Sequence, residues 1–287
     1  MKIGFIGTGV MGGAMALNLI KKGYSLNVFN RTKSKAQTLL DNGAIWKDSV
    51  KDVANSSDVI ISIVSFPKDV EQIYFGPEGI LENAQRGSIA IDMATSDPEL
   101  DKKIYEQGKK SGIAALDAPV SGGDVGAQKG TLCIMVGGDE KVYEEVLPIL
   151  KAMGSTIVYQ GGAGAGQQCK MANQIALAAT AMGVVEAFAF ADKAGLDREK
   201  VFKILSSGGA DSWQLEAYAP RIFKKDFGPG FYIKLLVKDL SIAKSEAKLM
   251  GLNLQALNLS DSLYQGLIDE GMGDLGMQAL IKLFEKD

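Results

Sequence analysis

The sequence predicts an α/β fold in two parts: a doubly wound, mostly parallel sheet in the first half of the chain and an all-helical second half. Near-continuous apolar runs, typical of strands buried on both faces, alternate with polar, helix-like segments up to residue 161. The first apolar run leads into a glycine-rich turn. After Gly166 the strand-like runs stop, and helical patterns continue to the end of the chain.

A glycine motif lies between the first two predicted strands. Residues 2–6, KIGFI, form a short apolar strand, and residues 7–12, GTGVMG, match the pattern GxGxxG. A helix over residues 14–22 follows and ends at Gly23, and residues 25–30, SLNVFN, supply a second alternating strand. This strand–turn–helix–strand context indicates a dinucleotide-binding, Rossmann-like first domain.

Each glycine of the motif has a physical purpose. Gly7 permits the tight turn, Gly9 lets the backbone approach a pyrophosphate, and Gly12 lets the helix pack closely on the strand. The backbone N–H groups at the helix start, around Val10 and Met11, then face the phosphates. A signal peptide or a membrane anchor is disfavoured because glycines interrupt the apolar run.

The end of the second strand selects between the two nicotinamide dinucleotides. A carboxylate there would hold the ribose 2′-OH of NAD, whereas this chain has Asn30, Arg31 and Thr32, followed by Lys33 and Lys35. Cationic and hydroxyl side chains suit a 2′-phosphate. NADP(H) is therefore expected in preference to NAD(H); the same residues would also suit a solvated helix start capped by Thr32.

Later strands point to further binding loops. Strands are expected over residues 58–64, 88–93, 114–120, 132–139 and 155–161. Ligands of doubly wound folds lie beyond the carboxyl ends of the strands. The candidate loops therefore contain Val64 and Ser65, Thr95, and Ser121 with the glycines after it.

The second half of the chain is predicted to be helical. A long segment from Gln167 to Gly195 has no strand punctuation, and helical patterns continue over residues 201–205, 233–250, 256–270 and 276–284. The expected domains are residues 1–163, which bind NADP, and residues 164–287, which serve the substrate and oligomerisation.

The long helix is expected to join the two parts and to be buried and central. From Ile175 it is apolar nearly all round, and Glu186 in its middle argues against a lipid-facing span. The breadth of its apolar surface suggests that a second chain covers part of it, in a homodimer or homotetramer.

Composition narrows the class of partner. The 287 residues carry 31 basic and 34 acidic side chains, a formal charge of -3, so a small molecule is expected as partner, with no nucleic acid and no membrane. Two cysteines without metal-binding spacing, and no histidine, argue against a disulfide framework and a metal site and fit a cytoplasmic protein. Proton chemistry must then use Lys, Asp, Glu, Tyr or Cys.

Lys170 and Asn173 are the candidate reactive residues of the long helix. They lie three residues apart near its start, so they share a face and are expected to point into the cleft where the domains meet. A lysine partly removed from water can act as a general acid, and its charge can stabilise an oxyanion. Residues 121–123, Ser-Gly-Gly, offer a hydroxyl and N–H groups to a carboxylate, or else form a plain turn.

Five segments resemble the β-hydroxyacid dehydrogenase family, in the same order along nearly the whole chain. They are GFIGTGVMGGAMALNLIKKG at residues 4–23, DMATSDP at 92–98, DAPVSGGDVGAQKGTL at 117–132, GAGQQCKMANQ at 164–174 and KDL at 238–240. The family includes 3-hydroxyisobutyrate dehydrogenase, tartronate semialdehyde reductase, and the glyoxylate and succinic semialdehyde reductases.

The resemblance implies reversible hydride transfer between NADPH and the carbonyl carbon of a short aldehyde-acid. It implies that Lys170 is the catalytic lysine and that Asn173 supports the substrate. Ser121, Gly122 and Gly123 are implied to bind the substrate carboxylate, and Thr95 to contact the nicotinamide side. Phe231, Lys238 and Asp239 are implied to close the site from the helical domain, with Lys238 on the cofactor side.

The substrate stays open between two branches of the family. Residues 123–127, GDVGA, resemble the hydroxyisobutyrate and tartronate semialdehyde branch, whereas residues 30–32, NRT, resemble the NADP-using reductases. The expected substrates are therefore succinic semialdehyde, glyoxylate, methylmalonate semialdehyde or tartronate semialdehyde. The alternative is an NADP-binding sensor or scaffold without catalysis, which should have lost the proton donor that Lys170 supplies.

Overall fold

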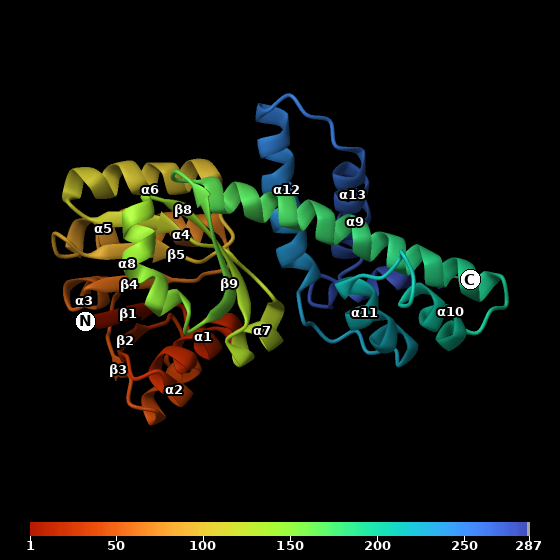
Figure 1. Cartoon of the computed structure of the whole chain (residues 1–287), viewed down its shortest axis with the longest axis horizontal. Coiled ribbons are helices and arrows are strands. Elements are labelled where there is room, and N and C mark those ends of the chain that lie inside the picture. The colour runs from red at the N-terminus through yellow and green to blue at the C-terminus, as the bar shows by residue number, and fades with distance from the viewer. Residues whose placement is uncertain (286–287) are drawn as a thin grey trace. The chain divides into compact units, whose positions relative to one another are not determined.

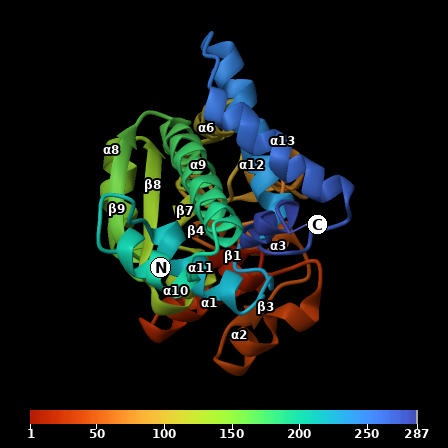
Figure 2. The ribbon, with the colours of Figure 1, turned by 90° about the vertical axis from the view of Figure 1, so that its right-hand side faces the viewer.

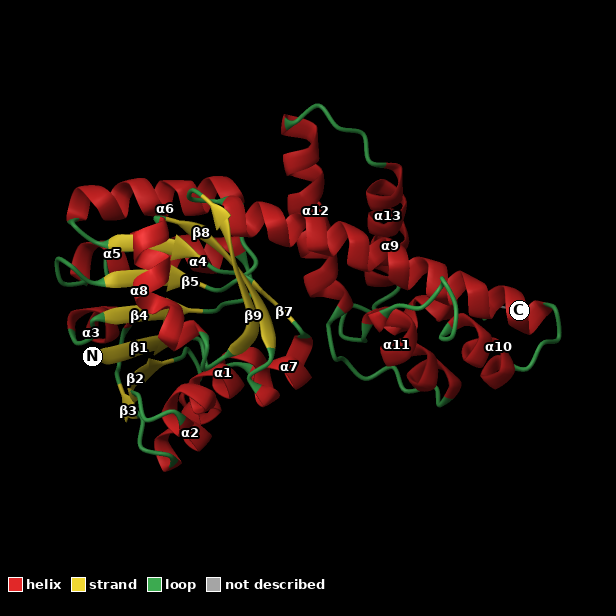
Figure 3. Cartoon of the chain, in the orientation of Figure 1, coloured by secondary structure: helices red, strands yellow, loops and turns green. Residues whose placement is uncertain are grey.

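The structure, a computed structural model, describes residues 1–285 of the chain. The chain packs as two units, Met1–Lys170 and Met171–Asp287, here called the first and second units. Figure 3 shows that, among the described residues, the strands belong to the first unit, while the second contains helices and loops.

The first unit is built on one nine-stranded sheet with the order β3-β2-β1-β4-β5-β6-β8-β7, in which β9 pairs with β8 (Figure 1). The strands are β1 Lys2–Ile6, β2 Ser25–Phe29, β3 Ile45–Trp46, β4 Val59–Ser62, β5 Ile89–Asp92, β6 Ala114–Asp117, β7 Val120–Ser121, β8 Leu132–Gly138 and β9 Gly154–Gly161. The six strands β1 to β6 are parallel to one another, and β8 is antiparallel to β6 and β7. The predicted doubly wound, mostly parallel sheet is confirmed.

Helices cover both faces of this sheet. They are α1 Val10–Lys21, α2 Gln37–Asp41, α3 Val50–Asn55, α4 Pro67–Phe75, α5 Ile80–Asn83, α6 Pro98–Ser111, α7 Gly123–Lys129 and α8 Glu140–Leu150, with the 3-10 helix η1 Lys33–Ala36. Alternate residues of β1 enter different cores: Ile3 and Phe5 pack with α1 and α8, whereas Ile6 packs with α3, α4, α5 and α6. Strands buried on both faces explain the near-continuous apolar runs.

The sheet differs from the sequence prediction after β5. Residues 114–120 were expected as one strand, but β6 ends at Asp117 and β7 begins at Val120. Pro119 lies between them and has no N–H for a strand ladder, so the chain breaks there and pairs again with β8. The two-residue strand β3 was not predicted, since its apolar pattern is too short to recognise.

The carboxylate of Asp117 fixes the start of the long helix α9, Ala165–Lys193. Its Oδ1 accepts the N–H of Gly164 at 2.8 Å, and its Oδ2 accepts the N–H of Gln167 at 2.9 Å. The helix start packs tightly on β8, because a Cβ on Gly166 would lie 2.4 Å from the Met135 carbonyl oxygen. The first turn of α9 therefore packs with the first unit, which ends at Lys170.

The second unit is all-helical, as predicted, and packs around the middle of α9. Its other helices are α10 Arg198–Leu205, α11 Trp213–Phe223, α12 Ile233–Leu249, α13 Gln255–Asp269 and the 3-10 helix η2 Met277–Leu283. Figure 2 shows α12 and α13 side by side as a helical hairpin. The core contains Phe188 of α9, Leu215 of α11, Leu236 of α12 and Tyr264 of α13. α11, which was not predicted, has Pro220 inside it.

Burial of α9 differs from the prediction. One side supplies core residues such as Val185 and Phe188, but Glu186 on the other side is exposed and Phe190 is 74% exposed. By length and composition alone α9 would pass as a membrane span; 39% of its most apolar window is buried inside the structure, and core helices of soluble proteins pass the same test.

A group of buried aspartate side chains lies at the C-terminal ends of β5 and β6 in the first unit. Asp92 ends β5, Asp117 ends β6, and Asp101 belongs to α6; all three are at most 4% exposed. Burial, together with the negative charges of Asp92 and Asp117, raises the pKa of Asp101 well above its usual value. Burial also raises the pKa of Asp117, although its backbone hydrogen bonds partly oppose the shift.

The space around two adjacent glycines, Gly12 and Gly13, predicts opposite effects of the same substitution. A Cβ on Gly12 would lie 2.0 Å from the carbonyl oxygen of Gly7, whereas a Cβ on Gly13 meets nothing closer than 3.5 Å. Gly12→Ala should lower the free energy of unfolding by about 1–3 kcal/mol through overpacking. Gly13→Ala should raise it by about 0.5–1 kcal/mol, because alanine stabilises a helix interior. Urea denaturation of both variants measures the difference, and a stabilised Gly12→Ala would contradict it.

The raised pKa of Asp101 predicts a pH-dependent gain from removing its charge. The neutral carboxyl is the form that the fold favours, so the free energy of unfolding falls as pH rises from the ordinary carboxyl pKa towards the raised one, by up to about 1.4 kcal/mol per pH unit. The Tm of Asp101→Asn relative to that of wild type should therefore be higher at pH 8 than at pH 5. Thermal unfolding at both values tests this, with Glu106→Gln, exposed on the same helix, as control. An equal Tm difference at the two pH values would refute the assignment.

Candidate active site

The glycine turn between β1 and α1 lies where the strand order reverses. β1 is flanked by β2 and β4, and this reversal is where doubly wound folds bind dinucleotides. Gly7 has φ +96°, and a Cβ there would lie 2.1 Å from the Ile63 carbonyl oxygen, so only glycine fits. A Cβ on Gly9 would meet nothing within 4 Å, which leaves this side of the turn open.

The start of α1 suits an anion. Gly9 is the N-cap residue and no side chain caps the helix, so the N–H groups of the first turn are available to a phosphate. Val10, the first residue of α1, is 67% exposed, and Met11 is partly buried against the core. Both predicted residues thus contribute backbone to the open turn.

Asn30 connects the glycine turn to the segment that follows β2. Its Oδ1 accepts the N–H of Thr8 at 3.1 Å, and its Nδ2 donates to the Thr32 carbonyl oxygen at 2.9 Å. Because one amide binds both segments, the glycine turn and the segment after β2 are held together.

The cationic residues after β2 are exposed. Arg31, whose side chain is 78% exposed, donates from Nη1 to Oδ1 of Asp69 at 3.1 Å. Thr32 precedes η1 but its side chain makes no capping hydrogen bond, and Lys35 is exposed. Asp69, in the first turn of α4, was missed by the sequence analysis, because an acidic residue there is typical of any helix start.

The loops after β4 and β5 carry the next predicted residues. Val64 is partly buried against the core and Ser65 is exposed. Thr95 is half-buried, and the two residues that flank it bind the side chain of Gln167: Ser96 N–H donates to Oε1 at 3.1 Å, and Nε2 donates to the Ala94 carbonyl oxygen at 2.8 Å. The sequence analysis did not single out Gln167.

Residues 121–123 form a sharp corner. Ser121 ends β7, and Gly122 and Gly123, with φ of +131° and +63°, lead into α7. A Cβ on Gly123 would meet nothing within 4 Å. The corner therefore combines a hydroxyl with backbone conformations that L-residues rarely adopt, and it is open at Gly123.

Lys170 lies in the second turn of α9 and its side chain is buried, with the residue 6% exposed. Lysines are among the residue types that are least often buried. The start of its helix is held by Asp117, so the backbone that carries the amine is fixed.

The second unit links three predicted residues through one that was not predicted. Asn173 Nδ2 donates to Gln174 Oε1 at 2.8 Å, and Gln174 Nε2 donates to Asp239 Oδ2 at 2.6 Å. Lys238 Nζ lies 2.8 Å from Asp239 Oδ1. Gln174, Asp239 and the Lys238 side chain are at most 13% exposed, so this network of α9 and α12 is buried.

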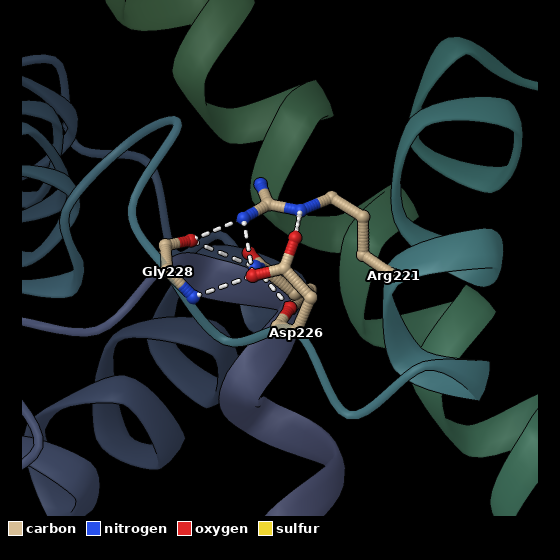
Figure 4. Close-up of polar contacts among 4 residues, drawn as sticks. Arg221, Asp226 and Gly228 are labelled. Atoms are coloured by element: carbon tan, nitrogen blue, oxygen red, sulfur yellow. Dashed lines mark hydrogen bonds and ion pairs between the residues drawn. The ribbon is translucent and has the colours of Figure 1, made fainter.

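Phe231 follows a loop that is fixed by Arg221 of α11 (Figure 4). Arg221 Nε donates to Asp226 Oδ2 at 2.9 Å, and its Nη2 also binds the Gly228 carbonyl oxygen. The guanidinium holds the pKa of Asp226 below its usual value. Phe231 then packs partly buried on the second core, and its carbonyl oxygen accepts the N–H of Met277 at 3.2 Å.

Among residues 1–285, no group of three or more Cys, Asp or Glu side chains is placed to hold a metal ion. The predicted residues thus form two sets: a cofactor and carboxylate set with Lys170 in the first unit, and Asn173, Phe231, Lys238 and Asp239 in the second.

Comparison with known proteins gives matches over both units. Residues 2–162 match the family model of the NAD binding domain of 6-phosphogluconate dehydrogenase, and residues 164–284 match that described as NAD-binding of NADP-dependent 3-hydroxyisobutyrate dehydrogenase. The chain is 52% identical over 284 residues to an uncharacterized oxidoreductase of Bacillus subtilis, with 99% of each chain covered.

Two relatives with named activities also match along their whole length. The 2-hydroxy-3-oxopropionate reductase of Escherichia coli is 40% identical, with 99% of this chain and 97% of the relative covered. The solved structure of Mycobacterium tuberculosis 3-hydroxyisobutyrate dehydrogenase with L-serine matches with a TM-score of 0.90 at 29% identity, covering 98% of each chain. The chain is therefore an oxidoreductase that acts on the CH-OH group of donors and belongs to the β-hydroxyacid dehydrogenase family.

Proposed function

We propose that the chain is an NADP(H)-dependent β-hydroxyacid dehydrogenase that reduces short aldehyde-acids to hydroxyacids. The observation that carries this proposal is the buried Lys170 on a helix whose start is fixed by the first unit. The activity printed for the Escherichia coli relative, reduction of 2-hydroxy-3-oxopropionate, supports an aldehyde-acid as substrate.

The residues present fit NADP. The glycine turn is open at Gly9, and the hydroxyl oxygen of Thr8 is buried there without a hydrogen-bond partner. Arg31 and Lys35 offer exposed positive charge after β2. We propose that the turn holds the pyrophosphate, that residues 30–32 with Lys35 hold the 2′-phosphate, and that Val64, Ser65, Thr95 and Lys238 contact the remainder of the dinucleotide.

The proposed mechanism assigns a separate task to each group. When bound, NADPH supplies the hydride that adds to the carbonyl carbon. As the carbon–oxygen double bond becomes a single bond, Lys170 donates a proton from its ammonium to the oxygen and is left as the neutral amine. Asn173 orients the substrate with Phe231 and Asp239, and residues 121–123 bind its carboxylate. Oxidation of the hydroxyacid reverses each step.

We further propose a cytoplasmic homodimer or homotetramer. Large apolar side chains of the second unit are exposed in the single chain: Phe190, Ile204, Trp213 and Leu249 are each at least 61% exposed. Apolar surface of this extent favours burial against a second chain, which the mass in solution tests. Both cysteines are free, in keeping with a reducing compartment.

The cofactor assignment predicts the outcome of a charge reversal. Steady-state oxidation of NADPH and of NADH is measured with glyoxylate, succinic semialdehyde, methylmalonate semialdehyde and tartronate semialdehyde. Wild type should prefer NADPH with one aldehyde-acid clearly ahead. Arg31→Asp, beside Asp69, should lower kcat/KM for NADPH by about 10- to 100-fold, as expected for a lost charge-assisted hydrogen bond, and leave NADH turnover nearly unchanged.

The matched control for this charge reversal is Lys141→Asp, at an exposed position of α8. It makes the same change of net charge away from the glycine turn and should keep the NADPH preference. An unchanged preference in Arg31→Asp would overturn the assignment of residues 30–32. Tight NADPH binding without turnover of any aldehyde-acid would instead favour a sensor or scaffold.

The proton-donor assignment predicts a loss of turnover without a loss of cofactor binding. Lys170→Ala should lower kcat by about 10²- to 10⁴-fold, the usual contribution of general acid catalysis, while the Kd for NADPH changes little. Lys193→Ala, at the exposed end of the same helix, should keep the wild-type kcat. The assignment fails if Lys170→Ala retains turnover near that of wild type.

A further inference from the structure

A single buried amide binds the backbone on both sides of Thr95. Gln167 is fully buried, at 0% exposure, in the first turn of α9. Its Oε1 accepts the N–H of Ser96 at 3.1 Å, and its Nε2 donates to the carbonyl oxygen of Ala94 at 2.8 Å. One side chain therefore fixes the peptide groups directly before and after Thr95.

The backbone of Gln167 is held by contacts other than those of its side-chain amide. The backbone N–H of Gln167 donates to Oδ2 of Asp117 at 2.9 Å, and a hydrogen bond from the Gln167 side chain opposes part of the rise in the pKa of Asp101 of α6. The adjacent Gly166 packs so closely on β6 and β8 that no Cβ would fit. The backbone that carries the Gln167 side chain is therefore held by β6 and β8, independently of the Thr95 segment.

Lys170 follows Gln167 by three residues, and residues at this spacing lie next to each other on the helix surface. We infer that Gln167 is a positioning residue that holds the Thr95 segment in a fixed place relative to the Lys170 amine. The inference rests on the proposed function, in which Thr95 contacts the nicotinamide side of the cofactor and Lys170 donates the proton. Gln167 would then fix the distance between the hydride donor and the proton donor.

An amide is the side chain that this geometry requires. The Thr95 segment presents an N–H and a C=O to the same point, so the partner must accept one hydrogen bond and donate another. A carboxylate accepts but does not donate, and here it would lie beside Asp101. An apolar side chain of the same length would leave both peptide groups buried without partners.

The first test measures the segment itself, without turnover. Gln167→Met keeps the length of the side chain and removes both hydrogen bonds. Amide hydrogen exchange of peptides that cover residues 93–97, in the protein without cofactor, should become at least 10-fold faster in this variant, while exchange in the Gly7–Gly12 turn stays within about 2-fold. Gln168→Met, at the half-buried neighbouring position, is the matched control and should leave both segments unchanged.

The second test separates positioning from folding. Per NADPH-binding site, kcat of Gln167→Met should fall about 10- to 100-fold, with a change below about 3-fold in the Kd for NADPH. The kinetic isotope effect with NADPH deuterated at C4 should rise, because a misplaced hydride donor slows the chemical step. A purely structural role would lower the folded yield and leave kcat per site and the isotope effect as in wild type.

Where Gln167→Met folds poorly, Gln167→Asn serves as the second variant, since it is polar but one methylene too short to reach both peptide groups. It should shift exchange and kcat in the same direction. Unchanged exchange at residues 93–97 in a folded variant would overturn the inference. An inactive wild type, or an active Lys170→Ala, would instead overturn the proposed function and leave the exchange result to decide whether Gln167 holds the segment.

Discussion

The candidate site depends first on the carboxylate of Asp117, which is buried at 2% exposure and accepts N–H groups at the start of α9. Burying a carboxylate costs free energy, and the raised pKa of Asp117 shows that its hydrogen bonds offset this cost only in part. The carboxylate determines where α9 begins. With the N–H groups of Gly164 and Gln167 bound, the first turn of α9 can begin only at the end of β6, so Gln167 and Lys170 inherit a fixed place in the first unit.

Steric exclusion plays the corresponding part at the glycine turn. Gly7 and Gly12 approach backbone atoms so closely that a Cβ on either would lie within 2.1 Å of a carbonyl oxygen. The turn therefore packs closely against the start of α1 and the end of β4. Asn30 connects the turn to the segment after β2. A cofactor that binds here meets a preformed surface, which lowers the entropy lost on binding.

The sequence predicts whatever is encoded by local pattern. Apolar runs located most of the strands, and the glycine spacing located the turn, because both signals lie within a few residues. Asp69, Gln167 and Gln174 were not found, since their partners are 38, 71 to 73 and 65 residues away. Nothing in the spacing of a glutamine indicates that its amide will bind a loop so distant in the chain. Likewise α11 was missed because Pro220, tolerated by packing on the core, weakens its helical pattern.

Two glutamines of α9 show how one helix can serve both units. Gln167 binds the Thr95 segment within the first unit, and Gln174 binds Asp239 of α12 within the second. Lys170 and Asn173 lie between them in the sequence, so each is bounded by a buried amide that its own unit holds in place. A helix is stiff over two turns, because its backbone hydrogen bonds overlap along that length. The residues proposed to act on the substrate therefore lie on a part of α9 that is held at both ends by a buried amide.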